Sequence, residues 1–317
     1  MNILLTGGTG LIGRALYPLL CENGFHVKCA LRKKNDGKII KEEDVFYYKN
    51  LDENTDWSHA LNNIDIVIHL AAQVPFDRKG DDNSYNKFYQ VNFKGTKRLA
   101  QQAAQANIRR FIFISTIGIL GISDLTTPLT EKSKENPNNN YAISKQMAEK
   151  ALCSIGNQSD MEVVILRPPL VYGPYVKANF LKLLDWVYKG IPLPFGGVKN
   201  QRNFIALENV IQAILTCVVY KKSVNEIFII SDDEYISTKD LIQKISNAMG
   251  RPARLFNFPI FFAKFLLIMI GKKSLYNKLW GSLRVDSKKI KEQIGWVPTV
   301  GMDEGIQKTV NWYLKGK

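Results

Sequence analysis

Two side chains four positions apart have the types and the spacing needed for proton transfer. Tyr141 and Lys145 lie in a segment whose pattern predicts a helix beginning near Asn140, so the phenol and the ammonium group share one helix face. A phenol with a pKa of about 10 is a poor base at neutral pH, but a fixed ammonium group nearby stabilises the phenolate. Tyr141 is therefore a candidate for moving a proton to or from a substrate hydroxyl. The spacing alone is common on amphipathic helices.

Hydroxyl side chains stand at the end of a predicted strand. Phe111–Ile114 is an apolar run, and Ser115 and Thr116 follow it directly. Thr116 would hold the reacting oxygen by a hydrogen bond while Tyr141 exchanges its proton. The polar loop over 117–139 is long enough to be functional rather than a simple connection.

The first thirteen residues predict a strand, a glycine turn and a helix. An apolar run ends at Thr6, glycines stand at Gly7, Gly10 and Gly13, and a helical pattern covers Leu11–Asn23. Glycines allow a tight turn and a close approach of the backbone to a pyrophosphate, and the helix N-terminus offers free N–H groups. In this context the glycines predict a dinucleotide site. A nicotinamide cofactor there would supply the hydride transfer that accompanies proton transfer.

The end of the second predicted strand bears on the choice of cofactor. An acidic residue that binds the adenosine ribose is expected ~20 residues after the glycines. Leu31 and Arg32 stand there, at the end of the strand His26–Leu31. Because a guanidinium group suits a 2′-phosphate, NADP(H) is favoured over NAD(H), which stays an alternative. The competing interpretation of Arg32 is an exposed loop arginine.

The elements that position these residues follow an α/β pattern. Strands and helices alternate through the first half, which predicts a parallel sheet with helices on both faces. His69, in one of these strands, is interpreted as a buried histidine bonded to backbone. The further strands and helices predicted in this half cover Val45–Tyr48, Thr55–Leu61, Ile64–Leu70, Ser84–Ala106 and Glu162–Leu166.

The alternation loosens after residue 166. We therefore expect a Rossmann-type doubly wound parallel sheet over 1–166 and a smaller α/β C-terminal substrate domain over 167–317, with some segments returning to the first domain. The helices and strands predicted in this half cover Asn179–Tyr188, Phe204–Ile205, Leu207–Val219, Ile227–Ile230, Thr238–Met249, Leu283–Val285, Ser287–Ile294 and Met302–Tyr313.

The net charge of the chain indicates which classes of binding partner to expect. The chain carries 43 Lys and Arg against 29 Asp and Glu, a formal net charge of +14, which attracts anions. The basic residues are spread along the chain and no module that reads nucleic acid is recognisable, so no nucleic-acid partner is expected. A field that steers an acidic small substrate is the favoured interpretation.

The N-terminal sequence and the cysteines are the basis for predicting the cellular compartment. The first strand begins at residue 2, which leaves no room for a signal peptide, and the four cysteines form no CxxC pair. The cysteines are interpreted as buried reduced thiols and the protein as cytoplasmic, with no metal site. Ile260–Ile270 is apolar but far shorter than the ~20 residues that span a bilayer. A buried helix is favoured there, with weak membrane-surface association as the alternative.

Several of these motifs, in order, resemble the extended short-chain dehydrogenase/reductase family of nucleotide-sugar epimerases, dehydratases and reductases. The resemblance covers nearly the whole chain and implies that Thr116, Tyr141 and Lys145 are catalytic. The matching motifs are Thr6–Gly13, His69–Ala72, Val91–Thr96, Tyr141-x-x-x-Lys145, Arg167-Pro168 and Val171–Pro174. The implied cofactor-binding residues are Gly7, Gly10, Leu11, Ile12, Gly13, Arg32, Asn50, Leu51, Leu70, Ala71, Ala72, Asn92, Ser115, Tyr141, Lys145 and Pro168. The implied substrate-binding residues are Gln73, Thr116, Asn179, Phe180 and Arg202.

The chain also departs from the family pattern. Thr116 replaces the commoner serine, which keeps the hydroxyl but adds a methyl group. Asn50 lies where a Gly-Asp pair often contacts the adenine. Leu31 and Arg32 replace the acidic ribose ligand, which speaks against the tightly held NAD of true 4-epimerases.

The second half is similar to a bacterial branch that acts on UDP-sugars in O-antigen and capsule synthesis. The resemblance implies an NAD(P)-dependent enzyme working at C4 of a UDP-hexose, most similar to 4-ketoreductases of UDP-4-keto-6-deoxy-N-acetylhexosamines. A UDP-hexose 4-epimerase with bound NAD is the alternative. A non-catalytic dinucleotide sensor is a further one, against which Tyr141 and Lys145 argue. The family commonly forms homodimers through helices that correspond here to Ser84–Ala106 and Asn140–Ile155.

Overall fold

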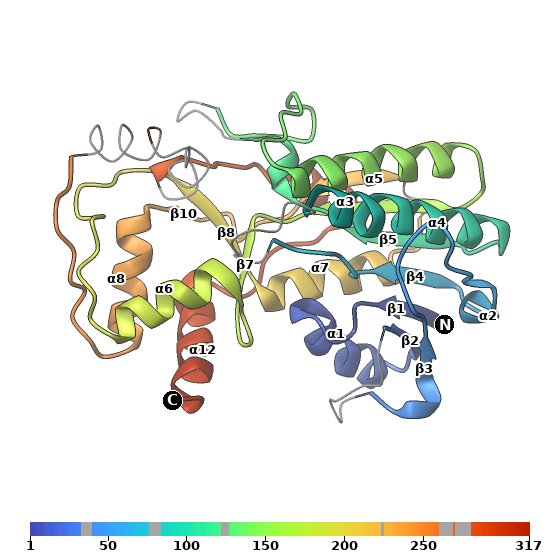
Figure 1. Ribbon diagram of the computed structural model, residues 1–317, viewed down its shortest axis with the longest axis horizontal. Coiled ribbons are helices and arrows are strands. Elements are labelled where there is room, and N and C mark those ends of the chain that lie inside the picture. Colours follow the sequence, from blue (N-terminus) through green and yellow to red (C-terminus); the bar gives the residue numbers. More distant parts are fainter. Residues whose placement is uncertain (33–39, 76–83, 122–126, 223–224, 260–268, 270–279) are drawn as a thin grey trace. The chain divides into compact units, whose positions relative to one another are not determined.

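The computed structural model describes residues 1–32, 40–75, 84–121, 127–222, 225–259, 269 and 280–317 (Figure 1). The chain forms two compact units: Met1–Ile119, Asn136–Arg167 and Ile211–Phe228 make unit 1, and Leu120–Glu135, Pro168–Val210 and Ile229–Lys317 make unit 2. In chain order the elements are β1 (Asn2–Thr6), α1 (Leu11–Glu22), β2 (His26–Leu31), η1 (Glu42–Asp44), β3 (Val45–Tyr47), α2 (Ser58–Leu61), β4 (Ile66–His69), α3 (Ser84–Phe88), η2 (Tyr89–Gly95), α4 (Thr96–Gln105), β5 (Arg110–Ile114), η3 (Ile117–Ile119), α5 (Asn140–Asn157), β6 (Glu162–Arg167), β7 (Leu170–Tyr172), α6 (Ala178–Tyr188), β8 (Arg202–Ala206), α7 (Leu207–Val219), β9 (Glu226–Ile229), β10 (Tyr235–Ile236), α8 (Thr238–Ala248), α11 (Lys288–Ile294) and α12 (Met302–Lys315).

Unit 1 is built on a seven-stranded sheet of order β3-β2-β1-β4-β5-β6-β9. The neighbouring pairs from β3 through β6 are parallel. In Figure 1, α3, α4 and α5 cover one face of this sheet and α1 and α7 cover the other. The apolar strand runs are therefore buried on both faces, and the predicted Rossmann-type doubly wound fold is confirmed. The strand order reverses between β1 and β4, and such a reversal opens a crevice at the carboxyl ends of the strands.

The single helix predicted over Ser84–Ala106 is divided. A π-helical stretch, η2, separates α3 from α4 and carries Asn92 and Gly95, both buried. A Cβ on Gly95 would lie 2.7–2.9 Å from atoms of Leu51, so the helix packs there against backbone. Apolar periodicity cannot reveal one widened turn, although such turns often occur at functional sites.

Unit 2 contains a three-stranded sheet of order β10-β8-β7 and a core of its own. Neither β7 nor β10 was predicted, and the strand predicted over Leu283–Val285 is wrong: that segment makes only isolated bridges. Both missed strands are too short for a period of two to show. The core of unit 2 includes Tyr172, Phe180, Leu184, Phe204, Ile242 and Ile306.

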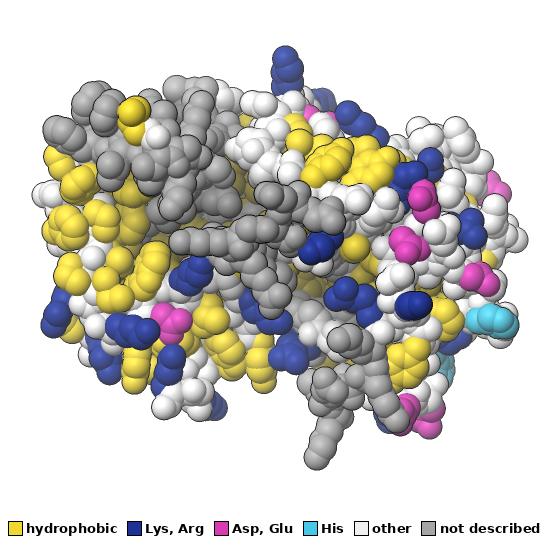
Figure 2. All heavy atoms as spheres, viewed as in Figure 1, with side chains coloured by type: hydrophobic (Ala, Val, Ile, Leu, Met, Phe, Trp, Pro, Cys, Tyr) yellow, Lys and Arg dark blue, Asp and Glu magenta, His cyan; other side chains and the backbone are white. Residues whose placement is uncertain are grey.

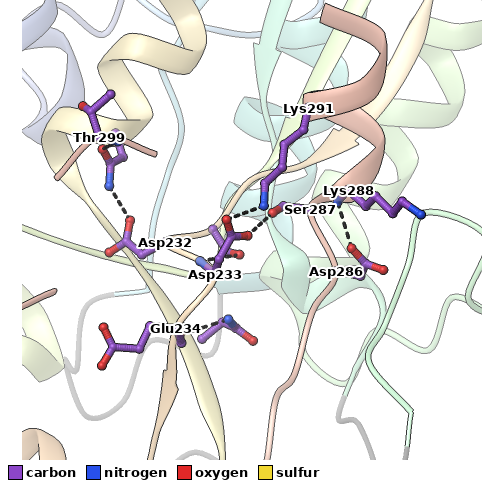
Figure 3. Close-up of polar contacts among 11 residues, drawn as sticks. Asp232, Asp233, Glu234, Asp286, Ser287, Lys288, Lys291 and Thr299 are labelled. Atoms are coloured by element: carbon purple, nitrogen blue, oxygen red, sulfur yellow. Dashed lines mark hydrogen bonds and ion pairs between the residues drawn. The ribbon is translucent and has the colours of Figure 1, made fainter. Parts of the chain in front are cut away.

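The half-buried carboxylate of Asp232 connects several elements of unit 2. Asp232 accepts hydrogen bonds from the Tyr172 hydroxyl (2.9 Å), the Asn209 amide (2.7 Å) and the Ala206 N–H. Burial raises the pKa of Asp232 to about 6. Beside it, Asp233 accepts a hydrogen bond from Ser287 and pairs with Lys291 of α11, as Figure 3 shows. These contacts fix the Val171–Pro174 motif within its unit.

The structure bears on the predictions about the cysteines and about membrane-spanning helices. Cys21 is exposed, so the prediction that all four cysteines are buried is wrong, although all are free thiols. Among the residues that the structure describes, no helix combines the length and the apolar character needed to span a bilayer. Apart from Met269, the Ile260–Ile270 segment lies outside the described residues.

Candidate active site

The glycine turn lies against the end of β4. Gly7 has a φ of +74°, and a Cβ there would lie 2.7 Å from the Ala71 nitrogen. A Cβ on Gly13 would lie 2.2 Å from the Gly7 carbonyl oxygen. Only glycine fits at positions 7 and 13 without moving backbone atoms of the turn. No side chain caps the N-terminus of α1, whose first turn holds Leu11 and Ile12, so its N–H groups can receive an anion.

A cavity of about 870 Å³ opens beside this turn. Among the described residues the lining is basic, with Arg14, Arg32, Lys49 and Lys87 against the carboxylate of Asp52. Sequence reasoning missed the lining residues Arg14 and Lys49. The predicted cofactor and substrate residues that line the cavity are Gly7, Gly10, Arg32, Asn50, Leu51, Leu70, Ala71, Ala72 and Gln73. Glycines with no room for a Cβ and a basic lining fit a dinucleotide.

Asn92 ties the cavity wall to the helix that carries Tyr141. Its Oδ1 accepts the Gln73 N–H (2.8 Å), and its Nδ2 donates to the Gln73 carbonyl (3.0 Å) and to Ser144 Oγ (3.1 Å). The Ser144 hydroxyl donates in turn to the Tyr141 carbonyl (2.8 Å). The π-helical turn therefore positions α5. Sequence reasoning missed Ser144 because its partner Asn92 is 52 positions away.

Lys145 is anchored below the end of β5. Its side chain is 2% exposed, and Nζ donates to the Ile114 carbonyl (2.7 Å) while lying 4.1 Å from the Phe113 ring centroid. Burial lowers the pKa of Lys145 to about 7, and the charge of Glu149 opposes this shift. The Lys145 side chain is therefore fixed at the end of β5 and shielded from solvent.

Tyr141 starts α5, one turn before Lys145. The Asn139 side chain caps this helix by accepting the Ala142 N–H (2.9 Å), which fixes where the helix begins. The Tyr141 ring is half-buried and packs edge-on against Phe88 at 6.1 Å. Burial raises the pKa of Tyr141 to about 12, so the phenol is protonated at neutral pH in the free protein.

The hydroxyl side chains lie at the carboxyl end of β5, as the sequence predicted. Thr116 Oγ accepts the Gly118 N–H (3.1 Å), which leaves its own proton free to donate. A Cβ on Gly118 would lie 3.3 Å from Thr116 Oγ and 3.7 Å from the Ala142 Cβ, so Thr116 is close to the first turn of α5. Ser115 Oγ is buried with no hydrogen-bond partner among the described residues, as expected of a group that meets a ligand.

His69 is buried as predicted, but its hydrogen-bond partners differ from the predicted backbone groups. It is fully buried and bonds to the hydroxyls of Thr6 (2.7 Å) and Thr96 (2.9 Å) rather than to backbone. Thr6 Oγ also accepts the Ala71 N–H, so Thr6 connects the His69 ring to the backbone that follows β4. Burial lowers the pKa of His69 to about 3, which keeps the ring neutral.

The remaining predicted residues belong to unit 2. Arg202 begins β8 and donates from Nη1 to the Gly281 carbonyl (2.9 Å), and burial lowers its pKa to about 10. Asn179 is exposed in the first turn of α6. Phe180 is buried and stacks on Tyr172 at 5.7 Å, so its side chain belongs to the core. Pro168 is buried after β6.

The crowding at Gly13 leads to a prediction. Gly13→Ala should weaken nucleotide binding by about 5- to 150-fold, because overpacking costs about 1–3 kcal/mol and the atoms that must move here are backbone atoms of the turn. Titration calorimetry with NAD(H) and NADP(H) measures the loss. Gly301→Ala is the matched control, because nothing lies within 4 Å of its added Cβ. Equal affinities in the two variants would contradict the role of the turn.

Known proteins resemble the chain over its whole length. The model of the NAD dependent epimerase/dehydratase family matches residues 3–231. A UDP-glucose 4-epimerase of Vibrio cholerae is 35% identical over 320 residues, which cover 99% of this chain and 96% of the relative. A dTDP-D-glucose 4,6-dehydratase of Mus musculus is 31% identical, with 99% and 89% covered.

The same fold occurs in a crystal structure of UDP-glucuronic acid 4-epimerase from Bacillus cereus in complex with UDP-glucuronic acid and NAD. The TM-score is 0.82 at 22% identity, and both chains are fully covered. The match to the family model spans the glycine turn, Thr116, Tyr141 and Lys145. This chain belongs to the NAD dependent epimerase/dehydratase family of enzymes.

Proposed function

We propose that the protein transfers hydride at C4 of a UDP-sugar, with Tyr141 moving the proton at the C4 oxygen. The observation that carries this proposal is the placing of α5 at the carboxyl end of β5: Lys145 binds the Ile114 carbonyl, and Thr116 lies near the first turn of α5, which holds Tyr141. The Vibrio cholerae relative, named a UDP-glucose 4-epimerase, supports the substrate class. A nicotinamide, when bound, would supply or accept the hydride. Gly7, Gly10, Gly13 and Ser115 would hold the cofactor.

In the free protein Tyr141 is in the protonated form that reduction of a ketone uses. Because burial raises the pKa of Tyr141 to about 12, its phenol is in the form that donates a proton to the C4 oxygen as that oxygen gains charge. Thr116 would hold the same oxygen by a hydrogen bond. The Lys145 ammonium would then stabilise the phenolate that remains. Oxidation of a C4 hydroxyl would instead need Tyr141 as the phenolate. The phenolate forms near neutral pH only if additional positive charge near the ring lowers the pKa of Tyr141.

The substrate we favour is a UDP-4-keto-6-deoxy-N-acetylhexosamine used for surface polysaccharide such as O-antigen or capsule. Arg32, Arg14 and Lys49 in the cavity lining support NADP(H), an exchangeable reductant for this reaction. The alternative is a UDP-hexose 4-epimerase with bound NAD, which the name of the Vibrio cholerae relative favours. In both cases Tyr141 handles the same proton.

Arg32 discriminates between the two cofactors. Arg32→Ala should weaken NADP(H) binding by about 10-fold or more and NAD(H) binding much less, because a hydrogen bond to a charged group contributes about 1.5–3 kcal/mol. Dissociation constants for both cofactors measure the difference. Arg109→Ala, an exposed arginine absent from the cavity lining, is the control. An equal loss for both cofactors would remove the argument for NADP(H).

Unit 2 is proposed to bind the UDP-sugar, with Arg202 and Asn179 at its diphosphate. A cytoplasmic homodimer through α3–α4 and α5 is also proposed. Tyr85, Tyr89 and Phe93 support it, because Tyr85 stacks on Tyr89, Tyr89 contacts Phe93 with tilted rings, and Tyr85 is exposed.

The first test is to purify the protein and ask whether a nucleotide comes with it. Two assays are then run in parallel. The first follows the loss of free NADPH with the 4-keto sugar, and the second follows the interconversion of UDP-glucose and UDP-galactose. Consumption of NADPH supports the reductase, and bound NAD with interconversion establishes the epimerase. Failure of both reactions would overturn the proposed function.

A further inference from the structure

Unit 2 exposes a surface that combines aromatic and aliphatic side chains with basic ones. We call it the basic aromatic face and define it by Trp186, Ile191, Phe256 and Phe258 with Lys189, Arg251 and Arg254. The four apolar side chains are 36%, 40%, 45% and 37% exposed. In Figure 2, hydrophobic side chains gather over the region of α6 and α8, with Lys and Arg side chains along their border.

Backbone hydrogen bonds hold the parts of this face together. Ile191 N–H donates to the Trp186 carbonyl at the end of α6. Leu193 N–H donates to the Arg254 carbonyl, and Phe256 N–H donates back to Leu193 (3.0 Å). Leu193 is buried and Leu255 half-buried, so alternation along the extended chain turns Arg254 and Phe256 outward.

The basic residues of the face are exposed. Arg251 lies over the Tyr188 ring at 4.3 Å and donates to the Tyr188 carbonyl, which holds its charge at the surface. The segments 186–200 and 250–259 together contain Lys189, Lys199, Arg251 and Arg254 and no Asp or Glu. Asp185, which precedes Trp186 on α6, pairs with Lys317, so the charge of the face is predominantly positive.

We propose that the basic aromatic face docks on an anionic lipid bilayer. Tryptophan and phenylalanine beside Lys and Arg is the composition that suits the interface between headgroups and acyl chains. A second copy of the chain would bring two positive faces together, which repel each other. The apolar side chains of Ile191, Phe256 and Phe258 would contribute nothing to binding the phosphates of a nucleic acid. The docking requires no spanning helix and is independent of the proposed reaction.

Co-sedimentation of the full chain with vesicles tests the docking. Vesicles of phosphatidylcholine with phosphatidylglycerol should pellet the protein, vesicles of phosphatidylcholine alone should pellet much less, and added salt should weaken the binding. Each basic residue near an anionic surface contributes about fivefold to partitioning. Lys189→Glu with Arg254→Glu should therefore reduce binding by about 25-fold or more.

Apolar insertion is tested separately by Phe256→Ser with Phe258→Ser, which should also lower vesicle binding. Val297→Ser and Lys221→Glu, exposed positions outside the face, are the matched controls and should bind like the parent chain. The proposal is overturned by three results: no binding to the anionic vesicles, equal binding by face and control variants, or loss of a dimer in ultracentrifugation as the sole effect of the face variants.

Discussion

Replacing Tyr141 by phenylalanine is expected to lower kcat by about 10²–10⁴-fold and to leave nucleotide affinity nearly unchanged. Phenylalanine keeps the ring that packs edge-on against Phe88, so the fold around α5 stays intact. The change removes only the hydroxyl that exchanges a proton with the C4 oxygen. Steady-state rates with the UDP-sugar, beside calorimetric titration of the cofactor, separate the two effects.

Tyr47→Phe is the matched control for this change. Tyr47 is an exposed tyrosine on the edge strand β3 of the same unit, so loss of its hydroxyl should leave the rate within about twofold. A Tyr141→Phe variant that turns over as fast as the control would remove Tyr141 from the reaction. The Thr116 hydroxyl would then be the remaining candidate for handling the proton.

Arg110→Met is expected to cost about 3–5 kcal/mol of the free energy of unfolding. Arg110 is fully buried, pairs with Glu162 (2.5 Å) and donates to the carbonyls of Cys217 (2.5 Å), Tyr220 (2.8 Å) and Lys222 (3.1 Å). It therefore binds the C-terminal end of α7 and the residues after it to β5, the strand that Ser115 and Thr116 follow. Methionine would leave those carbonyls and the carboxylate without their donor.

The neighbouring Arg109 gives a control of the same residue type. It is exposed, so Arg109→Met should change the free energy of unfolding by no more than about 0.5 kcal/mol. Denaturant titration of the two variants measures both values. Equal losses would show that the buried contacts of Arg110 contribute nothing specific to the fold.

Local patterns were enough to predict the frame of the site. The apolar run before Gly7, the glycine spacing and the helical pairing of Tyr141 with Lys145 each depend on neighbours in sequence. The order of strands and helices then places the carboxyl ends of β1, β4 and β5 at one edge of the sheet. For these reasons the fold class and the grouping of Thr116 with the first turn of α5 followed from sequence alone.

Long-range contacts explain what the sequence did not reveal. No sequence pattern singled out Arg110, because its partners lie 52 to 112 positions away. The bonds between Asn92, Gln73 and Ser144 cross between elements, so no spacing rule predicts them. The threonine partners of His69 also come from two other elements.

The most direct measurement of the central claim follows hydrogen at C4 of the sugar. The protein is incubated with a UDP-4-keto-6-deoxy-N-acetylhexosamine and NADPH deuterated at the transferable position of the nicotinamide, and the product is examined by NMR. We expect deuterium at C4 of the UDP-sugar and nowhere else on the ring. Deuterium at another carbon, or no turnover of this sugar together with no interconversion of UDP-hexoses, would contradict hydride transfer at C4.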